Sequence, residues 1–159
     1  VEKIREYPFH NGSTSYARIV KNHESIDQNA IINFLKDTHF YGLFDIEFKF
    51  ADGKAYFIEC NFRNGAPSYA ITVYGRNIPL LWLKDAVEGA QEEQDLTQYK
   101  TMYFMCEQND IINMLKGYVS PTMWLNEFIK SKKIFFSIKD IKPTLVYFFN
   151  IVKRRLNNR

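Results

Sequence analysis

The sequence predicts an α+β fold, with a mainly antiparallel sheet flanked by helices. Three observations support this class: segments with apolar residues at every second position, segments with apolar residues at helical spacing, and turn-forming residues between them. The chain of 159 residues is 46% hydrophobic and 16% aromatic, which is ample for a packed core. We therefore expect one compact domain with an appendage at its C-terminal side.

Two strands and a helix are predicted in the first 42 residues. Segments 3–9 and 16–20 have the alternation of strands and enclose a polar turn. Ser25 and Gln28 resemble a capping box and predict a helix that ends near Gly42.

A β-hairpin is predicted around Asp52-Gly53, because apolar residues occupy even positions and polar residues mostly odd positions on both sides of it. Only pairings whose residue numbers sum to an even value keep the polar side chains on one face. A two-residue turn breaks this rule, so we expect a three-residue loop in which Gly53 is left-handed and forms a bulge. Glu47 and Glu59 are then directly opposite or one diagonal apart.

This hairpin face has the composition of a metal site. Asn61 and Arg63 follow Glu59 at alternate positions, so they share its face. Two carboxylates this close repel unless a positive charge lies between them. Two anionic oxygen donors and one amide suit magnesium rather than zinc. The alternative is a solvated strand face that carries acids by chance.

The pattern of an acid on one strand followed by Glu-x-Asn-x-Arg on the next resembles the C-terminal part of the ATP-grasp ligase fold. The resemblance implies that Glu47, Glu59 and Asn61 bind the Mg²⁺ or Mn²⁺ ions that bridge the phosphates of ATP. It also implies that Arg63 is catalytic and lies beside the transferred phosphoryl group or the acyl phosphate. Phe62 stands where the family usually has proline.

The segment after the motif is similar to the same family. A small-residue loop leads to a helix that Asn77 can cap, that has Pro79 in its first turn and that ends at Gly89. ATP-grasp proteins of the carbamoyl-phosphate-synthase and D-aspartate-ligase types carry a similar loop and helix. The resemblance implies that residues 1–95 are the C-terminal portion of an ATP-grasp domain, and it is specific only over 41–89.

Residues 96–159 are expected to form a small α/β appendage docked on residues 1–95. The longest apolar run there is far shorter than the roughly 20 residues of a membrane span. Strands are predicted at 99–106 and 132–138, and helices at 109–116, 121–130 and from 142 onward. The last helix is expected to turn inward the apolar residues Leu145, Val146, Phe148, Phe149 and Val152.

The resemblance implies an ATP-dependent carboxylate–amine ligase of the amino-acid type. ATP would phosphorylate a small carboxylate substrate, and an amine acceptor would then displace phosphate from the acyl phosphate. The family also needs an N-terminal part that holds adenine and the α and β phosphates, so we expect this chain to be the C-terminal portion of a longer ligase and inactive alone. The alternative is a non-catalytic remnant that acts as a binding or interaction module. The sequence is also compatible with a homodimer.

The charge of the chain gives little support for a nucleic-acid or membrane partner. Of the net charge of +3, the four cations Lys153, Arg154, Arg155 and Arg159 contribute +4, so the remaining residues are close to neutral. That cluster could contact anionic lipid or nucleic acid, but cations at a helix C-terminus are ordinarily solvated. The aromatic residues have core-like spacing, which argues against a nucleic-acid groove.

Both cysteines are expected to be buried free thiols. Cys60 lies on the apolar face of the predicted hairpin and Cys106 at the end of a predicted strand, and the sequence has neither a cysteine framework nor a signal peptide. We therefore expect a cytoplasmic protein.

Overall fold

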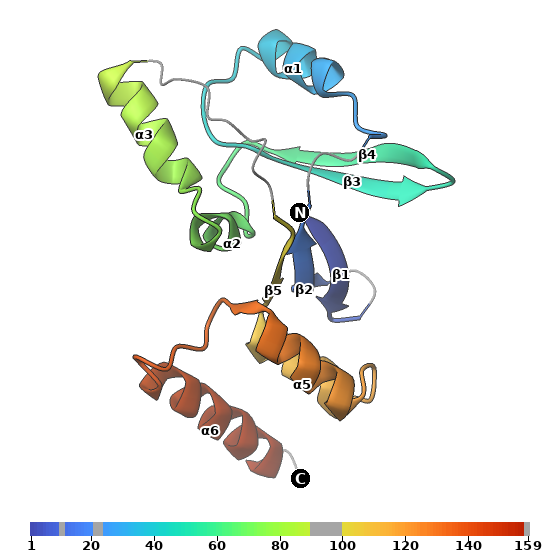
Figure 1. The fold of residues 1–159 in the computed structure, drawn as a ribbon, viewed down its shortest axis with the longest axis vertical. Coiled ribbons are helices and arrows are strands. Elements are labelled where there is room, and N and C mark those ends of the chain that lie inside the picture. The colour runs from blue at the N-terminus through green and yellow to red at the C-terminus, as the bar shows by residue number, and fades with distance from the viewer. Residues whose placement is uncertain (10–11, 21–23, 90–99, 158–159) are drawn as a thin grey trace. The chain divides into compact units, whose positions relative to one another are not determined.

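The computed structural model describes residues 1–9, 12–20, 24–89 and 100–157, and only the main chain of 151, 152 and 154–157. It confirms the α+β class, with helices and two sheets in which antiparallel pairs predominate (Figure 1). The chain divides into two compact units. The first unit joins Val1–Arg18 to Met102–Arg159, and the second contains Ile19–Thr101.

This division differs from the predicted boundary between 1–95 and 96–159. The first strands lie in the same four-stranded sheet as the strands after residue 101, and the Cys106 N–H donates to the Ser15 carbonyl at 2.8 Å. Sequence alternation predicted these strands but could not identify their distant partners. The order is β1-β2-β5-β6, with β1 Glu2–Tyr7, β2 Ser13–Ile19, β5 Met102–Met105 and β6 Lys132–Lys133.

Helices of the first unit follow the predictions closely at their N-termini. Ser120 caps α5 and accepts from the Met123 N–H, and Pro121 is its first residue. Gly117, at φ 80°, follows the C-cap of α4. The helices are α4 Glu107–Leu115, α5 Pro121–Lys130 and α6 Lys142–Asn157.

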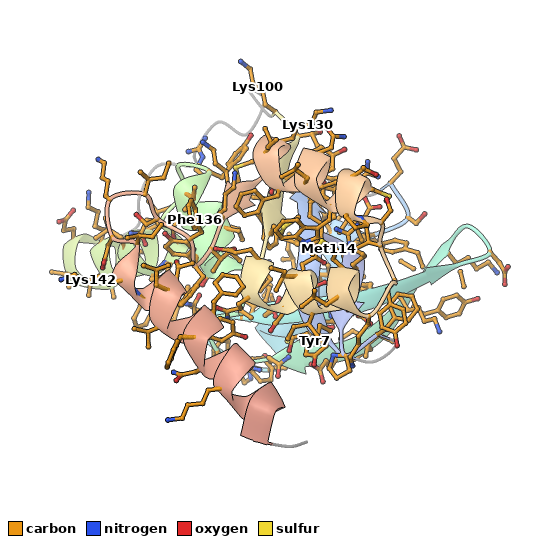
Figure 2. All side chains as sticks on the ribbon, turned by 90° about the horizontal axis from the view of Figure 1, so that it is seen from below. Tyr7, Lys100, Met114, Lys130, Phe136 and Lys142 are labelled. Carbon is orange, nitrogen blue, oxygen red and sulfur yellow. The ribbon has the colours of Figure 1, made fainter. Side chains whose placement is uncertain are left out.

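The strand predicted at 132–138 is only two residues long. The buried carboxylate of Glu107 accepts the N–H groups of Ile134 at 3.2 Å, of Phe135 at 2.9 Å and of Phe136. Of these residues, Phe136 is labelled in Figure 2. Because a side chain binds these three donors, β6 ends at Lys133.

The inward face predicted for α6 was wrong for Leu145, Val146 and Phe149, whereas Phe148 is half-buried. Thr144 is buried, Tyr147 donates its hydroxyl to the Gln108 carbonyl at 3.4 Å, and the rings of Tyr147 and Phe135 are 5.5 Å apart. Residues three and four apart share a helix face, so a face that contains Thr144 and Tyr147 excludes most of the predicted set. Leu145, Val146 and Phe149 are exposed, whereas the side chain of Val152 lies outside the described residues.

A buried ion pair lies at the centre of the first unit. Arg5 of β1 binds Asp110 of α4 through two hydrogen bonds, of 3.0 and 2.8 Å, and Glu127 of α5 through a third of 2.6 Å. Asp110 is fully buried and Arg5 is only 9% exposed. Burial alone lowers the pKa of the Arg5 guanidinium, but its hydrogen bonds to the two carboxylates raise it above its ordinary value. Arg5 is therefore a permanently charged link between a strand and two helices.

Neutral donors complete the hydrogen bonding of Asp110. Ser15 donates to its Oδ1 at 2.8 Å, and the Asn113 amide donates to Ser15 Oγ and to the Glu6 carbonyl, both at 3.0 Å. The network therefore fixes β1, β2 and α4 together.

The second unit is built on a hairpin, to which α1 is attached by ring contacts. The centroids of Phe34 and Phe57 are 6.1 Å apart. Asp27 caps α1 rather than Ser25, whose hydroxyl instead donates to the Gly53 carbonyl at 3.1 Å. The elements are α1 Gln28–Asp37, β3 Asp45–Ala51, β4 Lys54–Asn61, α2 Ser68–Val73 and α3 Ile78–Glu88.

As predicted, Asn77 caps α3 by accepting from the Leu80 N–H at 3.1 Å, Pro79 lies in its first turn, and Gly89 is its C-cap. Both cysteines are free, as predicted, but they are half-buried rather than buried.

We expect Asp110→Asn to lower the free energy of unfolding of the first unit by about 3 kcal/mol, because it leaves a buried guanidinium without its main partner. Urea unfolding followed by Trp124 fluorescence in a Trp82→Phe background measures this. Glu2→Gln is the matched control, since Glu2 binds Arg18 with the same two-bond geometry at 2.8 and 3.0 Å but at the surface. Equal losses of unfolding free energy in the two variants would contradict the conclusion that the buried Arg5–Asp110 pair stabilises the first unit more than a surface pair does.

Because the pKa of Tyr16 is raised in the folded chain, we expect the free energy of unfolding to fall at alkaline pH. Burial, assisted by the negative charge of Glu127 and opposed by Arg5, raises the pKa of Tyr16 from 10.0 to about 12. The unfolded chain therefore loses this proton before the folded chain does, and the stabilisation is complete below pH 10 and is lost as the pH rises to about 12. Tyr16→Phe should reduce the decline of the unfolding free energy with pH over this range. An unchanged decline in this variant would argue against a role for Tyr16 in the pH dependence.

Candidate functional site

The predicted acids lie on the paired strands β3 and β4, which form the hairpin seen in Figure 1. Glu47 pairs directly with Glu59, and Asp45 pairs with Asn61. Directly paired residues of antiparallel strands point to the same side, with Cβ atoms roughly 5 Å apart. The predicted sharing of one face by Glu47, Glu59 and Asn61 is therefore confirmed.

The turn that sets this register is not the predicted three-residue loop. Phe50 pairs with Ala55 and Ala51 with Lys54, so the loop contains only Asp52 and Gly53. Their φ values of 52° and 72° are both left-handed, as in the type I′ turns that fit the twist of a hairpin.

A bulge restores the even register beyond this turn. Pairs near the turn have odd sums, but the register shifts between Phe48–Phe57 and Glu47–Glu59, which leaves Ile58 without a direct partner. Phe57, which pairs with Phe48, lies on the same face as Phe48. The centroids of their rings are 6.2 Å apart in an edge-to-face arrangement. The prediction of a bulge was right, but its place was wrong: it lies in β4, next to the acids.

Hydrogen bonds connect the predicted site residues in series. Asn61 donates its amide to Glu59 Oε1 at 2.7 Å, and Arg63 Nη2 donates to Asn61 Oδ1 at 3.4 Å. Arg63 Nη1 also donates to the Asn64 carbonyl at 3.3 Å. The short turn in which the Arg63 N–H bonds to the Asn61 carbonyl at 2.8 Å keeps this residue next to the strand end.

Asp45 belongs to the same polar face, although sequence reasoning did not select it. It is half-buried, and a Cβ placed on Gly65 would lie 2.7 Å from its carboxyl carbon, so the chain after the motif passes directly over Asp45. Its position two residues before Glu47 was the available signal. Burial and the nearby charge of Asp45 also raise the pKa of the Cys60 thiol.

The face is accessible and supplies oxygen donors. Glu59 and Arg63 are exposed, and Glu47 and Asn61 are half-buried. Within the described residues, no group of three or more His, Cys, Asp and Glu side chains could hold a metal. The oxygen donors that Glu47, Glu59 and Asn61 offer are two paired carboxylates and one amide.

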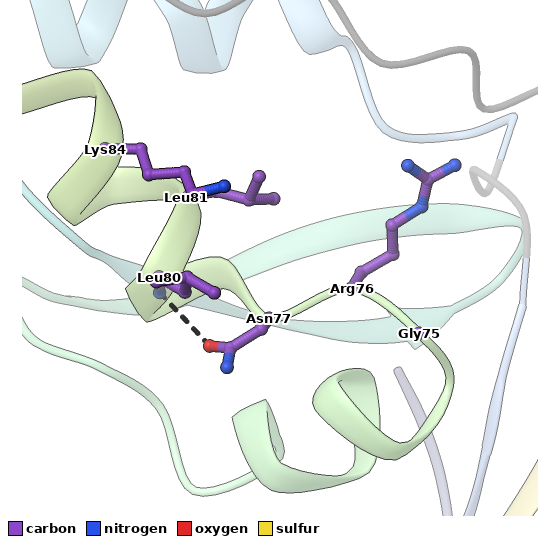
Figure 3. A pocket seen from close by; sticks show the side chains of 6 residues that line it. All are labelled: Gly75, Arg76, Asn77, Leu80, Leu81 and Lys84. Atoms are coloured by element: carbon purple, nitrogen blue, oxygen red, sulfur yellow. Dashed lines mark hydrogen bonds between the residues drawn. The ribbon is translucent and has the colours of Figure 1, made fainter. Parts of the chain in front are cut away.

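A separate pocket of about 170 Å³ lies where α2 leads into α3 (Figure 3). Its wall combines Arg76 and Lys84 with Leu80 and Leu81. Asn77 occupies the helix N-terminus itself, so the pocket offers cationic side chains but not a fully open helix end.

No protein-family model, curated protein or solved structure matches this chain. Among the described helices, none combines the length and the apolar character required to cross a membrane.

We expect Gly53→Ala to loosen the hairpin, because alanine at φ 72° costs about 1 kcal/mol. Amide hydrogen exchange of β3 and β4, measured by NMR, should accelerate about fivefold. Asp52→Asn should leave exchange unchanged, since asparagine adopts φ 52° readily. Acceleration by Asp52→Asn and not by Gly53→Ala would contradict the turn assignment.

Proposed function

We propose that the β3–β4 hairpin is the metal- and phosphate-binding part of an ATP-grasp carboxylate–amine ligase. The observation that carries this proposal is the direct pairing of Glu47 with Glu59, with Asn61 and Arg63 hydrogen-bonded in line beside them. These are the positions at which the Glu-x-Asn-x-Arg resemblance requires ligands.

Electrostatics favours a cation at this pair. Like charges placed directly opposite on neighbouring strands destabilise a sheet. The neutral amide of Asn61 donates to Glu59 at 2.7 Å. A divalent cation would replace this repulsion with attraction, and Mg²⁺ or Mn²⁺ accepts such a set of hard oxygens.

The small number of protein ligands also agrees with the proposal. Magnesium in phosphoryl-transfer sites is held by one or two carboxylates together with substrate phosphates, not by a complete protein cage. Glu47, Glu59 and Asn61 would hold the metal, whose charge would stabilise the phosphates of ATP during transfer.

Arg63 would stabilise the reacting phosphoryl group. Its guanidinium is exposed and is held near the acids by Asn61 and Asn64. In the proposed reaction, the substrate carboxylate oxygen bonds to the γ-phosphorus of ATP as the bond to ADP breaks. The amine then attacks the acyl carbon, phosphate leaves, and a proton is released from nitrogen. Arg63 would bind the phosphoryl oxygens in both steps.

The rest of the phosphate clamp and the acceptor-carboxylate site would come from the N-terminal part of the same enzyme. The proposal places this enzyme in the cytoplasm, with ATP, a small carboxylate and an amine as its substrates.

The second candidate is a non-catalytic ATP-grasp remnant that binds a partner. The observation in its favour is the exposure of large apolar side chains on the hairpin, with Tyr56, Phe57 and Ile58 each about half exposed. This candidate requires no metal at Glu47 and Glu59.

Mn²⁺ titration of the isotope-labelled chain distinguishes the two functions. The paramagnetic ion should broaden the NMR signals of residues around Glu47 and Glu59 first, and the Glu47→Gln/Glu59→Gln variant should lose at least about tenfold in Mn²⁺ affinity. ATP should enhance Mn²⁺ binding, because phosphates would complete the coordination.

Asp52→Asn is the matched control for this titration. It removes one carboxylate from the same hairpin, five residues from Glu47, or roughly 16 Å along the strand. The control should bind Mn²⁺ like the unaltered chain. Broadening that is spread over unrelated surface acids, or that survives the double substitution, would reject the metal site and favour the binding module.

A further inference from the structure

Helix α6 has a second apolar face that the first unit leaves uncovered. Thr144 and Tyr147 face the body of the unit, whereas Leu145 and Val146 are each 59% exposed and Phe149 is 69% exposed. At 100° per residue, these three residues lie on the side of the helix opposite Thr144 and Tyr147. The fold therefore does not explain the apolar character of this outer face.

Two lysines border the same face. Lys142, at the beginning of the helix (labelled in Figure 2), and Lys153, near its end, are both exposed. With Leu145, Val146 and Phe149 they fall within an arc of about 100°. The outer face of α6, made of these five residues, is thus an apolar centre with a cation at each end.

The charge of the helix is uniform in sign. Residues 142–157 contain Lys142, Lys153, Arg154 and Arg155 and no aspartate or glutamate. Immediately before the helix, Ile138 is 85% exposed and Lys139 is exposed. Asp140 is the one acid between Ile138 and the end of the chain.

We propose that the outer face of α6 binds the surface of an anionic lipid bilayer, with the helix lying in the plane of the headgroups. Leu145, Val146 and Phe149 would enter the boundary between headgroups and acyl chains, while Lys142 and Lys153 extend to lipid phosphates. This surface role is compatible with a helix that is too short and too charged to span the membrane.

Charge complementarity favours lipid over a second copy of the chain. Two copies that meet through this face would bring their cations together, and no carboxylate of α6 could neutralise them. An anionic bilayer supplies both the opposite charge and an apolar layer.

Vesicle co-sedimentation tests the proposal with the full 159-residue chain. The chain should bind phosphatidylcholine vesicles that contain phosphatidylserine, and it should bind far less to phosphatidylcholine alone. Lys142→Gln/Lys153→Gln should weaken binding about fivefold for each lysine. Leu145→Ser/Phe149→Ser should weaken it about tenfold for each side chain.

Matched controls use α5 and the strand β6 that follows it. Met123→Ser/Leu125→Ser removes two apolar side chains of α5 that are 50% and 53% exposed, and Lys130→Gln/Lys132→Gln removes two exposed lysines. Both controls should bind vesicles like the unaltered chain, and circular dichroism should show equal helix content in all variants.

Equal binding to neutral and anionic vesicles, or equal losses in the α6 variants and their controls, would overturn the proposal. So would a dimer that forms without lipid and that Leu145→Ser/Phe149→Ser dissociates. Because no metal takes part, this experiment succeeds or fails independently of the Mn²⁺ titration.

Discussion

The buried guanidinium of Arg5 is the constraint on which the first unit depends. It binds Asp110, 105 positions away in sequence, and Glu127, 122 positions away. A buried carboxylate such as Asp110 is tolerated only when a charged partner and further donors surround it. Ser15 of β2 and Asn113 of α4 both donate to this acid. The buried ion pair therefore needs these two donors in addition to Arg5. The strand of residues 2–7 cannot leave this sheet without exposing an uncompensated buried charge.

Sequence patterns predicted the elements of this chain better than their partners. Alternation located β3 and β4, and Asn77, Pro79 and Gly89 bounded α3, because these signals act over a few residues. The assignment of β1 to a sheet with β5 depends on contacts a hundred residues apart, which no local pattern contains. Glu107 shows the same limit, since its capture of three backbone N–H groups ends β6 early.

The hairpin shows how a correct register can arise from a wrong turn. Parity required Glu47 and Glu59 to share a face, either directly opposite or one diagonal apart. The structure pairs them directly, but it reaches that register by combining a two-residue type I′ turn with a bulge at Ile58. The two-residue turn that Asp52-Gly53 favours would place the polar side chains of the two strands on opposite faces. One extra residue in β4 allows this turn and still brings Glu47 and Glu59 to one face. Asp45 was overlooked because its proximity to Gly65 depends on the path of the loop after the motif.

The acids of this chain fall into two electrostatic classes, and the difference bears on function. Asp110 and Glu107 are buried and receive either a guanidinium or several backbone donors, so folding accounts for them. Glu47 and Glu59 instead face each other on an accessible strand pair, where an amide donates to one of them. Direct pairing of like charges opposes hairpin stability. Under the proposed function, a divalent cation that also binds phosphate would offset this repulsion, and such a ligand requires an accessible face.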